Sequence, residues 1–163
     1  MDFDNFLANF YFGSLDMEKF HSFRDLEEDD KTREITEKYK EITERYPSSY
    51  LEEKGTIPAE LLDELKKIGF FGLNIPKEYG GVGLSVRQYL KVVAELSSSD
   101  LALALVSLAH LSIGCKGIIL FGNEAQKKKY LVPAATGEMI FSYALAEPKI
   151  GSYAKHIETM AAL

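Results

Sequence analysis

The chain has 163 residues, 46% of them hydrophobic, and a formal net charge of −6 at pH 7. This length suits one domain that buries roughly 70% of its unfolded surface. The acidic balance and the absence of a basic face argue against nucleic-acid binding.

Residues 1–24 form an aromatic N-terminal segment, in which the phenylalanines at positions 3, 6 and 10 have helical spacing. Gly13 ends the aromatic run, and Ser14 is a plausible N-cap for a short second helix. Two interpretations of the aromatics remain open. They pack on the core of their own domain, or they dock on another domain.

A charge-dense stretch, residues 25–46, has a thin apolar stripe and predicts a surface helix that stops before Pro47. Residues 47–57 are predicted to be a polar connection. Pro58 suits the first turn of the next helix, and Gly69 suits the position after its end.

Three glycines in four positions, Gly80-Gly81-Val82-Gly83, invite comparison with a phosphate-binding loop. The spacing differs from that of a P-loop, no Gly-Lys-Ser/Thr follows, and no strand–turn–helix unit surrounds it. A sharply turned structural loop is the better interpretation.

Two helices follow, the first capped by Ser85 and running to about residue 96, the second capped by Asp100. The second, residues 100–121, is the longest apolar stretch. A membrane span is the rival interpretation, but His110, Lys116 and the lack of flanking charge asymmetry favour the central helix of a bundle. No transmembrane segment is therefore expected.

The last helix begins after Asn123, as its cap, and ends at Gly137. Residues 139–146 then alternate in the manner of a strand, and Pro148 forces an extended backbone before a turn. The predicted fold is mainly α: an orthogonal or up-down helical bundle over residues 25–137. It ends in one β-strand, the start of an incomplete second domain over residues 138–163.

Candidate chemical groups are few. His21, His110 and His156 lack the spacing of metal ligands, so no metal site is predicted. His110 is expected to be a hydrogen-bonded core or pocket-lining residue, and Cys115, the single cysteine, a buried inert thiol. No second group supports Glu147 as a base, so a backbone-shaping or hydrogen-bonding role is preferred for it.

Several motifs together resemble the N-terminal helical domain of the acyl-CoA dehydrogenases, with the strongest likeness to the very-long-chain branch. The resemblance covers most of residues 3–163. The motifs are the turn from Ile75-Pro76 through Tyr79-Gly80-Gly81-Val82-Gly83-Leu84, the run from Ala109-His110-Leu111-Ser112-Ile113-Gly114-Cys115-Lys116-Gly117 to Gly122, and Gln126-Lys127, Tyr130-Leu131-Val132-Pro133 and Gly137-Glu138.

The resemblance implies an oxidoreductase that converts a long-chain acyl-CoA to the trans-2-enoyl-CoA. In the family, FAD accepts the hydride, and electrons leave to an electron-transfer flavoprotein. A homodimer or higher oligomer is implied for the complete enzyme. No targeting signal is recognised at the acidic N-terminus, which implies a cytoplasmic bacterial-type enzyme. A processed eukaryotic chain would instead reside in the mitochondrial matrix or at the inner-membrane face.

By the same resemblance, Tyr143, Leu145 and Ala146 lie along the flavin, and Ser152 meets both the flavin loop and the CoA portion of the substrate. Helices 85–96 and 100–121 would line the acyl-chain channel. The catalytic glutamate belongs to the family's C-terminal domain, so no residue of this chain is assigned to catalysis, and the chain alone is expected to be inactive.

Three departures stand in the strongest motif. Ala146 replaces a threonine whose hydroxyl bonds the flavin, Tyr153 replaces an aspartate, and Lys149-Ile150 replaces a small pair. Three interpretations remain open: an N-terminal fragment of a dehydrogenase, one chain of a split enzyme, or a stand-alone non-enzymatic interaction module.

Overall fold

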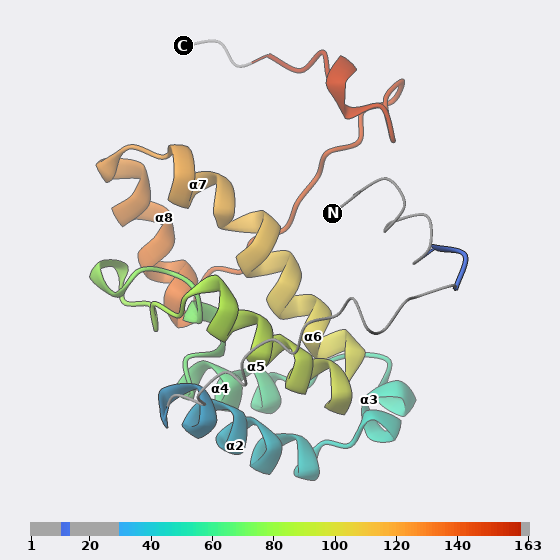
Figure 1. Cartoon of the computed structure of the whole chain (residues 1–163), viewed down its shortest axis with the longest axis vertical. Helices are drawn as coiled ribbons and strands as arrows, with labels where there is room; N and C mark the ends of the chain where they lie inside the picture. Colours follow the sequence, from blue (N-terminus) through green and yellow to red (C-terminus); the bar gives the residue numbers. More distant parts are fainter. Residues whose placement is uncertain (1–10, 14–29, 161–163) are drawn as a thin grey trace.

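The computed structural model describes residues 11–13 and 30–160 of the chain. Within them the protein is mainly helical; short connections join the helices from α2 to α8, and an extended stretch leads from α8 to the short helix η5 (Figure 1). In chain order they are α2 (Asp30–Arg45), α3 (Ser48–Lys54), α4 (Ala59–Lys67), η2 (Phe70–Gly72), η3 (Lys77–Tyr79), α5 (Val86–Ser99), α6 (Leu101–Ser107), η4 (Leu108–Gly114), α7 (Lys116–Phe121), α8 (Glu124–Thr136) and η5 (Ala154–His156). The predicted mainly helical fold is confirmed.

The core lies between α2, α4, α5, α8 and the continuous helix α6–η4–α7. α5 packs against both α2 and α6, and α8 covers η2 and η3. The largest side chains with almost no exposure gather there: Tyr39, Leu61, Leu65, Phe70, Phe71, Leu73, Ile75, Leu96, Leu103, His110, Leu111 and Leu131.

Side-chain caps set three of the helix starts. Ser85 and Asn123 each form a reciprocal capping box with the glutamine three residues later. Asp100 accepts a hydrogen bond from the backbone N–H of Leu103 at 2.9 Å. These caps confirm the predicted starts, although α5 runs on to Ser99 instead of stopping near residue 96.

The glycine turn is structural, as predicted. A Cβ on Gly81 would lie 2.0 Å from the carbonyl oxygen of Ile75, so only glycine fits there. The backbone N–H groups of Val82, Gly83 and Leu84 donate to carbonyls of residues 72, 75 and 73 at 2.8 to 3.0 Å. Those groups are therefore occupied and cannot cradle a phosphate.

The long apolar helix spans Leu101–Phe121, 21 residues with a mean hydropathy of 1.8, and by length and composition alone it could cross a membrane. It carries the buried His110 and packs on α5 and α8, which fits the central helix of a bundle. Its middle turn, η4, is π-helical: the N–H of Cys115 donates to the carbonyl of His110 at 2.8 Å.

Two predicted elements differ from the structure. The connection 47–57 contains the helix α3, because Pro47 and the left-handed Gly55 bracket a short turn whose Leu51 is buried in the core. Residues 139–146 form no strand with any described residue, and only an isolated bridge joins Glu147 to Ile150. A strand needs a partner to pair with, and the described part of the chain supplies none.

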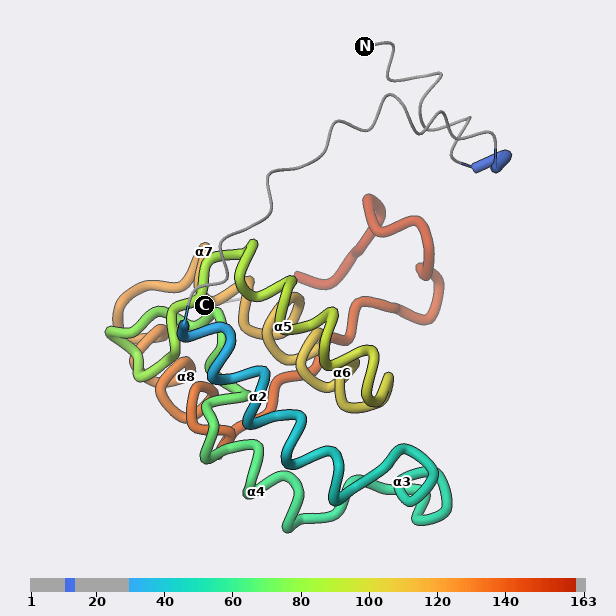
Figure 2. The backbone as a smooth tube through the Cα atoms, turned by 60° about the horizontal axis from the view of Figure 1, so that its bottom comes forward, coloured from blue at the N-terminus to red at the C-terminus, as the bar shows by residue number. Residues whose placement is uncertain are grey.

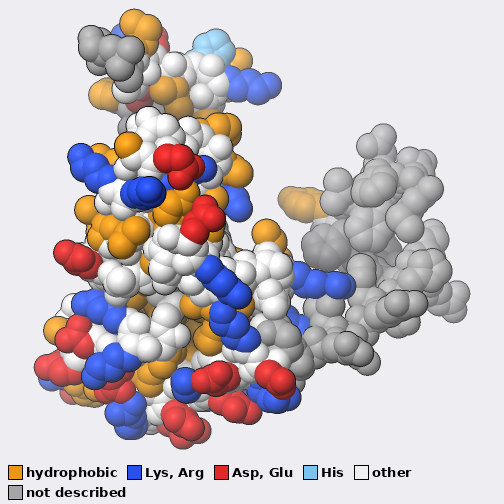
Figure 3. Space-filling view, turned by 90° about the vertical axis from the view of Figure 1, so that its left-hand side faces the viewer, with side chains coloured by type: hydrophobic (Ala, Val, Ile, Leu, Met, Phe, Trp, Pro, Cys, Tyr) orange, Lys and Arg blue, Asp and Glu red, His pale blue; other side chains and the backbone are white. Residues whose placement is uncertain are grey.

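Past α8 the chain leaves the bundle, and residues 142–160 extend away from the helices (Figure 2). Charged side chains crowd the opposite end of the molecule, which holds α2 and α4 (Figure 3). Most expectations for residues 1–24 lie outside the described residues. Of that segment, Tyr11 and Phe12 are described, and both are exposed.

Candidate functional site

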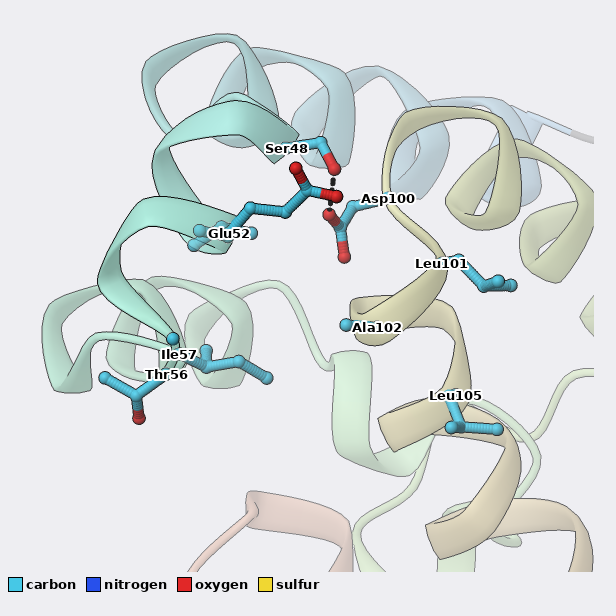
Figure 4. A pocket seen from close by; sticks show the side chains of 10 residues that line it. Ser48, Glu52, Thr56, Ile57, Asp100, Leu101, Ala102 and Leu105 are labelled. Atoms are coloured by element: carbon cyan, nitrogen blue, oxygen red, sulfur yellow. Dashed lines mark hydrogen bonds between the residues drawn. The ribbon is translucent and has the colours of Figure 1, made fainter.

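A groove of about 530 Å³ lies between α3 and the first turns of α6 (Figure 4). Its volume falls within the range of small-molecule sites, roughly 300–1,000 Å³. Apolar and polar side chains from both helices line it: Ser48, Leu51, Glu52, Thr56, Ile57, Asp100, Leu101, Ala102 and Leu105, with Gly55 at the end of α3.

The polar end of the groove is built around Asp100, which is 7% exposed. Its Oδ2 accepts a hydrogen bond from the Ser48 hydroxyl at 2.7 Å, while its Oδ1 caps α6 at Leu103. Burial raises the pKa of the Tyr39 phenol, and the nearby charge of Asp100 raises it further. Both Asp100 oxygens are engaged, so this carboxylate holds α3 against α6 and is not a free acid or base.

Leu101 and Leu105 of the groove belong to a larger set of apolar side chains that the long helix leaves exposed. Leu101 and Leu105 of α6 are 71% and 61% exposed, and Leu120 and Phe121 of α7 are also exposed. Val86 and Leu90, one helical turn apart on α5, are exposed as well. Helices α5, α6 and α7 thus present large apolar side chains to the outside of the described structure.

The predicted flavin and substrate residues lie on the extended segment after α8. Tyr143, Leu145, Ala146 and Ser152 are all exposed. None of them lines the groove, so the structure does not bring these two regions together.

Glu147, at the end of this segment, organises the turn that follows. Its carboxylate accepts hydrogen bonds from the backbone N–H groups of Glu158 and Thr159 at 3.0 and 2.8 Å and from the Thr159 hydroxyl. The Thr159 hydroxyl and these amides lower its pKa. The predicted hydrogen-bonding role is confirmed.

His110 occupies the centre of the bundle with no exposed surface. Its Nε2 lies 3.1 Å from the Phe71 carbonyl oxygen and 3.2 Å from that of Ala134, and its Nδ1 lies 3.0 Å from the Phe141 backbone nitrogen. Burial lowers the pKa of His110, and the two carbonyl contacts oppose that shift. The predicted hydrogen-bonded core role is confirmed.

Cys115 is fully buried, and burial raises the pKa of its thiol to about 12, so it stays protonated as predicted. Within residues 11–13 and 30–160, no three His, Cys, Asp or Glu side chains lie where they could share a metal ion.

The groove itself was missed by sequence reasoning, because its α3 wall lies in the stretch predicted to be a polar connection. A signal was present: Pro47 before the helix and Gly55 after it are typical of a short helix. No residue of α5 lines the groove, although helix 85–96 was expected to line an acyl channel with helix 100–121.

Comparison with known proteins shows the family of the chain. The sequence profile of the family described as Acyl-CoA dehydrogenase, N-terminal domain, matches residues 28–138. The chain belongs to the acyl-CoA dehydrogenase family through this domain.

The very long-chain specific acyl-CoA dehydrogenase of Macaca fascicularis mitochondria is 49% identical over 100 residues, which are 61% of this chain and 15% of that protein. Butyryl-CoA dehydrogenase from Megasphaera elsdenii superposes with a TM-score of 0.70 at 32% identity, over 80% of this chain and 36% of that one. An FAD-complexed acyl-CoA dehydrogenase from Bacillus anthracis superposes with a TM-score of 0.69 at 31% identity, over 88% of this chain and 25% of that one. The chain thus spans well under half the length of these relatives.

The exposed segment fits a flavin in one respect and departs from the family in another. Within the described residues, the backbone groups of residues 142–146 make no hydrogen bonds, so they are free to pair with polar ring atoms. The side chain of Ala146 offers no hydroxyl.

Proposed function

We propose that this chain supplies the N-terminal helical portion of an FAD-dependent acyl-CoA dehydrogenase that acts on long-chain acyl-CoA. One observation carries the proposal: α5, α6 and α7 leave apolar side chains exposed, while the adjoining extended segment leaves its backbone unpaired. Exposed apolar patches and unpaired backbone are typical of a domain whose binding site is completed by neighbouring domains.

In the complete enzyme, the groove and the exposed apolar surface of α6 and α7 would receive the acyl chain and exclude water from it. Leu101, Leu105 and Ile57 supply apolar contact without any charge. Removing apolar surface from water contributes roughly 25 cal/mol per Å². These residues would therefore favour a long alkyl chain over a short one.

The segment from Tyr143 to Ala146 would lie along one edge of the flavin, held mainly through backbone groups, and Ser152 would approach the CoA portion. Bound FAD would accept the hydride removed from the substrate. We assign no catalytic residue to this chain, because the catalytic glutamate of the family belongs to its C-terminal domain. The proton acceptor would come from another domain, and electrons would pass to an electron-transfer flavoprotein.

The family relatives include a mitochondrial protein and bacterial ones, so either setting suits the proposed function. A homodimer or higher oligomer of the complete enzyme also belongs to the proposal.

The experiment joins this chain to the middle and C-terminal domains of a relative. Dye reduction with palmitoyl-CoA is measured for the isolated chain with added FAD and for the chimera, with the intact relative as control. We expect turnover and bound FAD in the chimera and none in the isolated chain, because turnover needs the flavin and the base in one geometry. A folded chimera without FAD or turnover would contradict the proposal.

A non-enzymatic interaction module is the second candidate, favoured by Ala146, Lys149-Ile150 and Tyr153 in place of the family's residues. Tyr153 is 62% exposed, and its ring centroid lies 4.0 Å from that of His156 in a tilted arrangement, so the pair presents an exposed aromatic surface that a partner could contact. The same chimera distinguishes the two functions, since a pure interaction module would retain no FAD.

A further inference from the structure

The buried imidazole of His110 joins the helical bundle to the start of the extended segment. Its Nε2 faces two carbonyl oxygens, of Phe71 and Ala134, and both can only accept. Nε2 must therefore carry the proton. The lone pair is left on Nδ1, where it accepts a hydrogen bond from the backbone N–H of Phe141 at 3.0 Å.

The packing around this bond is as specific as the bond itself. Gly114 lies against Phe141, and a Cβ at position 114 would come within 2.6 Å of the Phe141 Cβ. The Phe141 ring packs near His110 and Tyr130, with centroids 6.1 and 6.4 Å away. The π-helical turn η4 carries both His110 and Gly114. This one turn therefore contacts Phe141 through the His110 ring and through the backbone of Gly114.

Phe141 is the last anchored amide before the proposed flavin residues. The N–H of Met139 donates to the carbonyl of Pro133 at 3.0 Å, whereas residues 142–146 make no backbone hydrogen bond within the described structure. In an extended chain, every second side chain shares a face. Phe141 therefore sets the face on which Tyr143 and Leu145 emerge, and a slip of one residue would reverse it.

We propose that His110 is a positioning residue that fixes the register of residues 141–146 and so decides which side chains face the flavin. The inference rests on the proposed function for its consequence, but the bond itself is tested in this chain alone. An ordinary core histidine would matter only for packing. If His110 fixes the register, protection of the Phe141 amide must depend on the hydrogen-bond acceptor at Nδ1 in particular.

Two variants separate these roles. In His110→Asn, the side-chain oxygen replaces the Nδ1 acceptor, and the donor to the two carbonyls is lost. In His110→Gln, the amide nitrogen replaces the Nε2 donor, and the acceptor for Phe141 is lost. Both remove the imidazole and its packing, so they are matched controls for each other. Gly114→Ala tests the same anchor from the neighbouring turn.

Hydrogen exchange of individual amides is measured by NMR on the full chain, together with the imidazole ¹⁵N shifts. We expect the Nε2–H tautomer and a protected amide at residue 141. His110→Gln and Gly114→Ala should speed exchange at residue 141 by about tenfold, as expected for losing one hydrogen bond. His110→Asn should keep that protection to within about threefold. The Met139 amide is the internal reference, because its acceptor is unchanged.

A proton on Nδ1 in the ¹⁵N spectrum would overturn the proposal. So would an amide at residue 141 that exchanges as fast as those at 142 and 144, or equal exchange there in the Asn and Gln variants. In the chimera, His110→Gln should retain several-fold less FAD than His110→Asn, and equal retention would refute the effect on the flavin site. A parent chimera without FAD would count against the proposed function and leave the exchange result standing.

Discussion

The helical body, residues 30–137, and the segment after it, residues 138–160, obey different physical constraints. The body buries a core of large side chains and caps the starts of α5, α6 and α8 with its own side chains. The segment leaves Tyr143 56% exposed, makes no backbone hydrogen bond over residues 142–146 within the described structure, and is anchored to the body at Met139 and Phe141. The body is thus determined by contacts within it, whereas the segment leaves most of its side chains exposed.

This difference shows where stability and function are separated in the chain. Most residues buried in the body core lie away from the proposed flavin residues, and the exposed residues of the segment contribute little to holding the body together. His110 is the exception, because it is buried in the core and also holds Phe141. Apart from His110, core substitutions should therefore change unfolding, and segment substitutions should change flavin handling.

The sharpest test of the body is Phe71→Ala. Phe71 is fully buried between Phe70 and His110, so the variant leaves a large cavity and should lower the free energy of unfolding by about 3–5 kcal/mol. Phe121→Ala is the control, because that ring is 86% exposed and its loss should change stability by no more than about 0.5 kcal/mol. Urea unfolding followed by circular dichroism at 222 nm measures both free energies of unfolding. Similar losses in the two variants would contradict the conclusion that the buried core determines the stability of the body.

A smaller loss is expected from adding one methyl group at a glycine. In Gly81→Ala the new Cβ would meet the Ile75 backbone at 2.0 Å, so the turn must shift at a cost of about 1–3 kcal/mol. Gly151→Ala in the segment meets nothing within 4 Å and should leave stability unchanged. Thermal unfolding of both variants compares them directly, and a Gly81→Ala protein as stable as the parent would show that the turn is less constrained than its contacts indicate.

Acidification should weaken the body through His110. Burial holds its pKa below the unfolded value of about 6.5, so the folded state binds the proton less readily than the unfolded state. The contribution is complete above about pH 6.5 and is lost as the pH falls toward the folded pKa, by at most about 1.4 kcal/mol per pH unit. Cys115, 3.9 Å from Nδ1, stays neutral throughout.

Urea unfolding between pH 7 and pH 5 measures this slope. His110→Gln should flatten it, since no proton is bound at that position. His156→Gln is the control, because His156 lies exposed in the segment and its loss should leave the slope as it was. A slope that persists in His110→Gln would assign the pH dependence to other groups.

The smallest expected effect concerns the segment. In the chimera, Ala146→Thr restores the hydroxyl of the family pattern, and one hydrogen bond to the flavin contributes about 0.5–1.5 kcal/mol. FAD content after gel filtration and the rate of flavin bleaching by a long-chain acyl-CoA should both rise. Ala144→Thr adds the same hydroxyl two residues away and should change neither value. Equal values for Ala146 and its threonine variant would show that the alanine is compensated elsewhere.

Local signals along the chain determined much of this protein. The caps at Ser85, Asp100 and Asn123 and the close of the last helix at Gly137 depend on atoms within four residues, so the sequence predicts them directly. The burial of His110 follows from its place in the longest apolar stretch. The family resemblance rests on the same kind of local evidence, short motifs in a set order.

Only the tertiary structure decided the rest. The short helix α3 depends on Leu51 reaching the core and on Ser48 meeting Asp100, 52 residues away. Residues 139–146 have the alternation of a strand but no partner among the described residues, and a strand's hydrogen bonds come from its neighbour. The partners of His110 lie 39, 24 and 31 residues from it, so its proton and its hold on Phe141 follow only from the packed bundle. Sequence periodicity reports which face is buried, but the atoms that meet there are chosen by the fold.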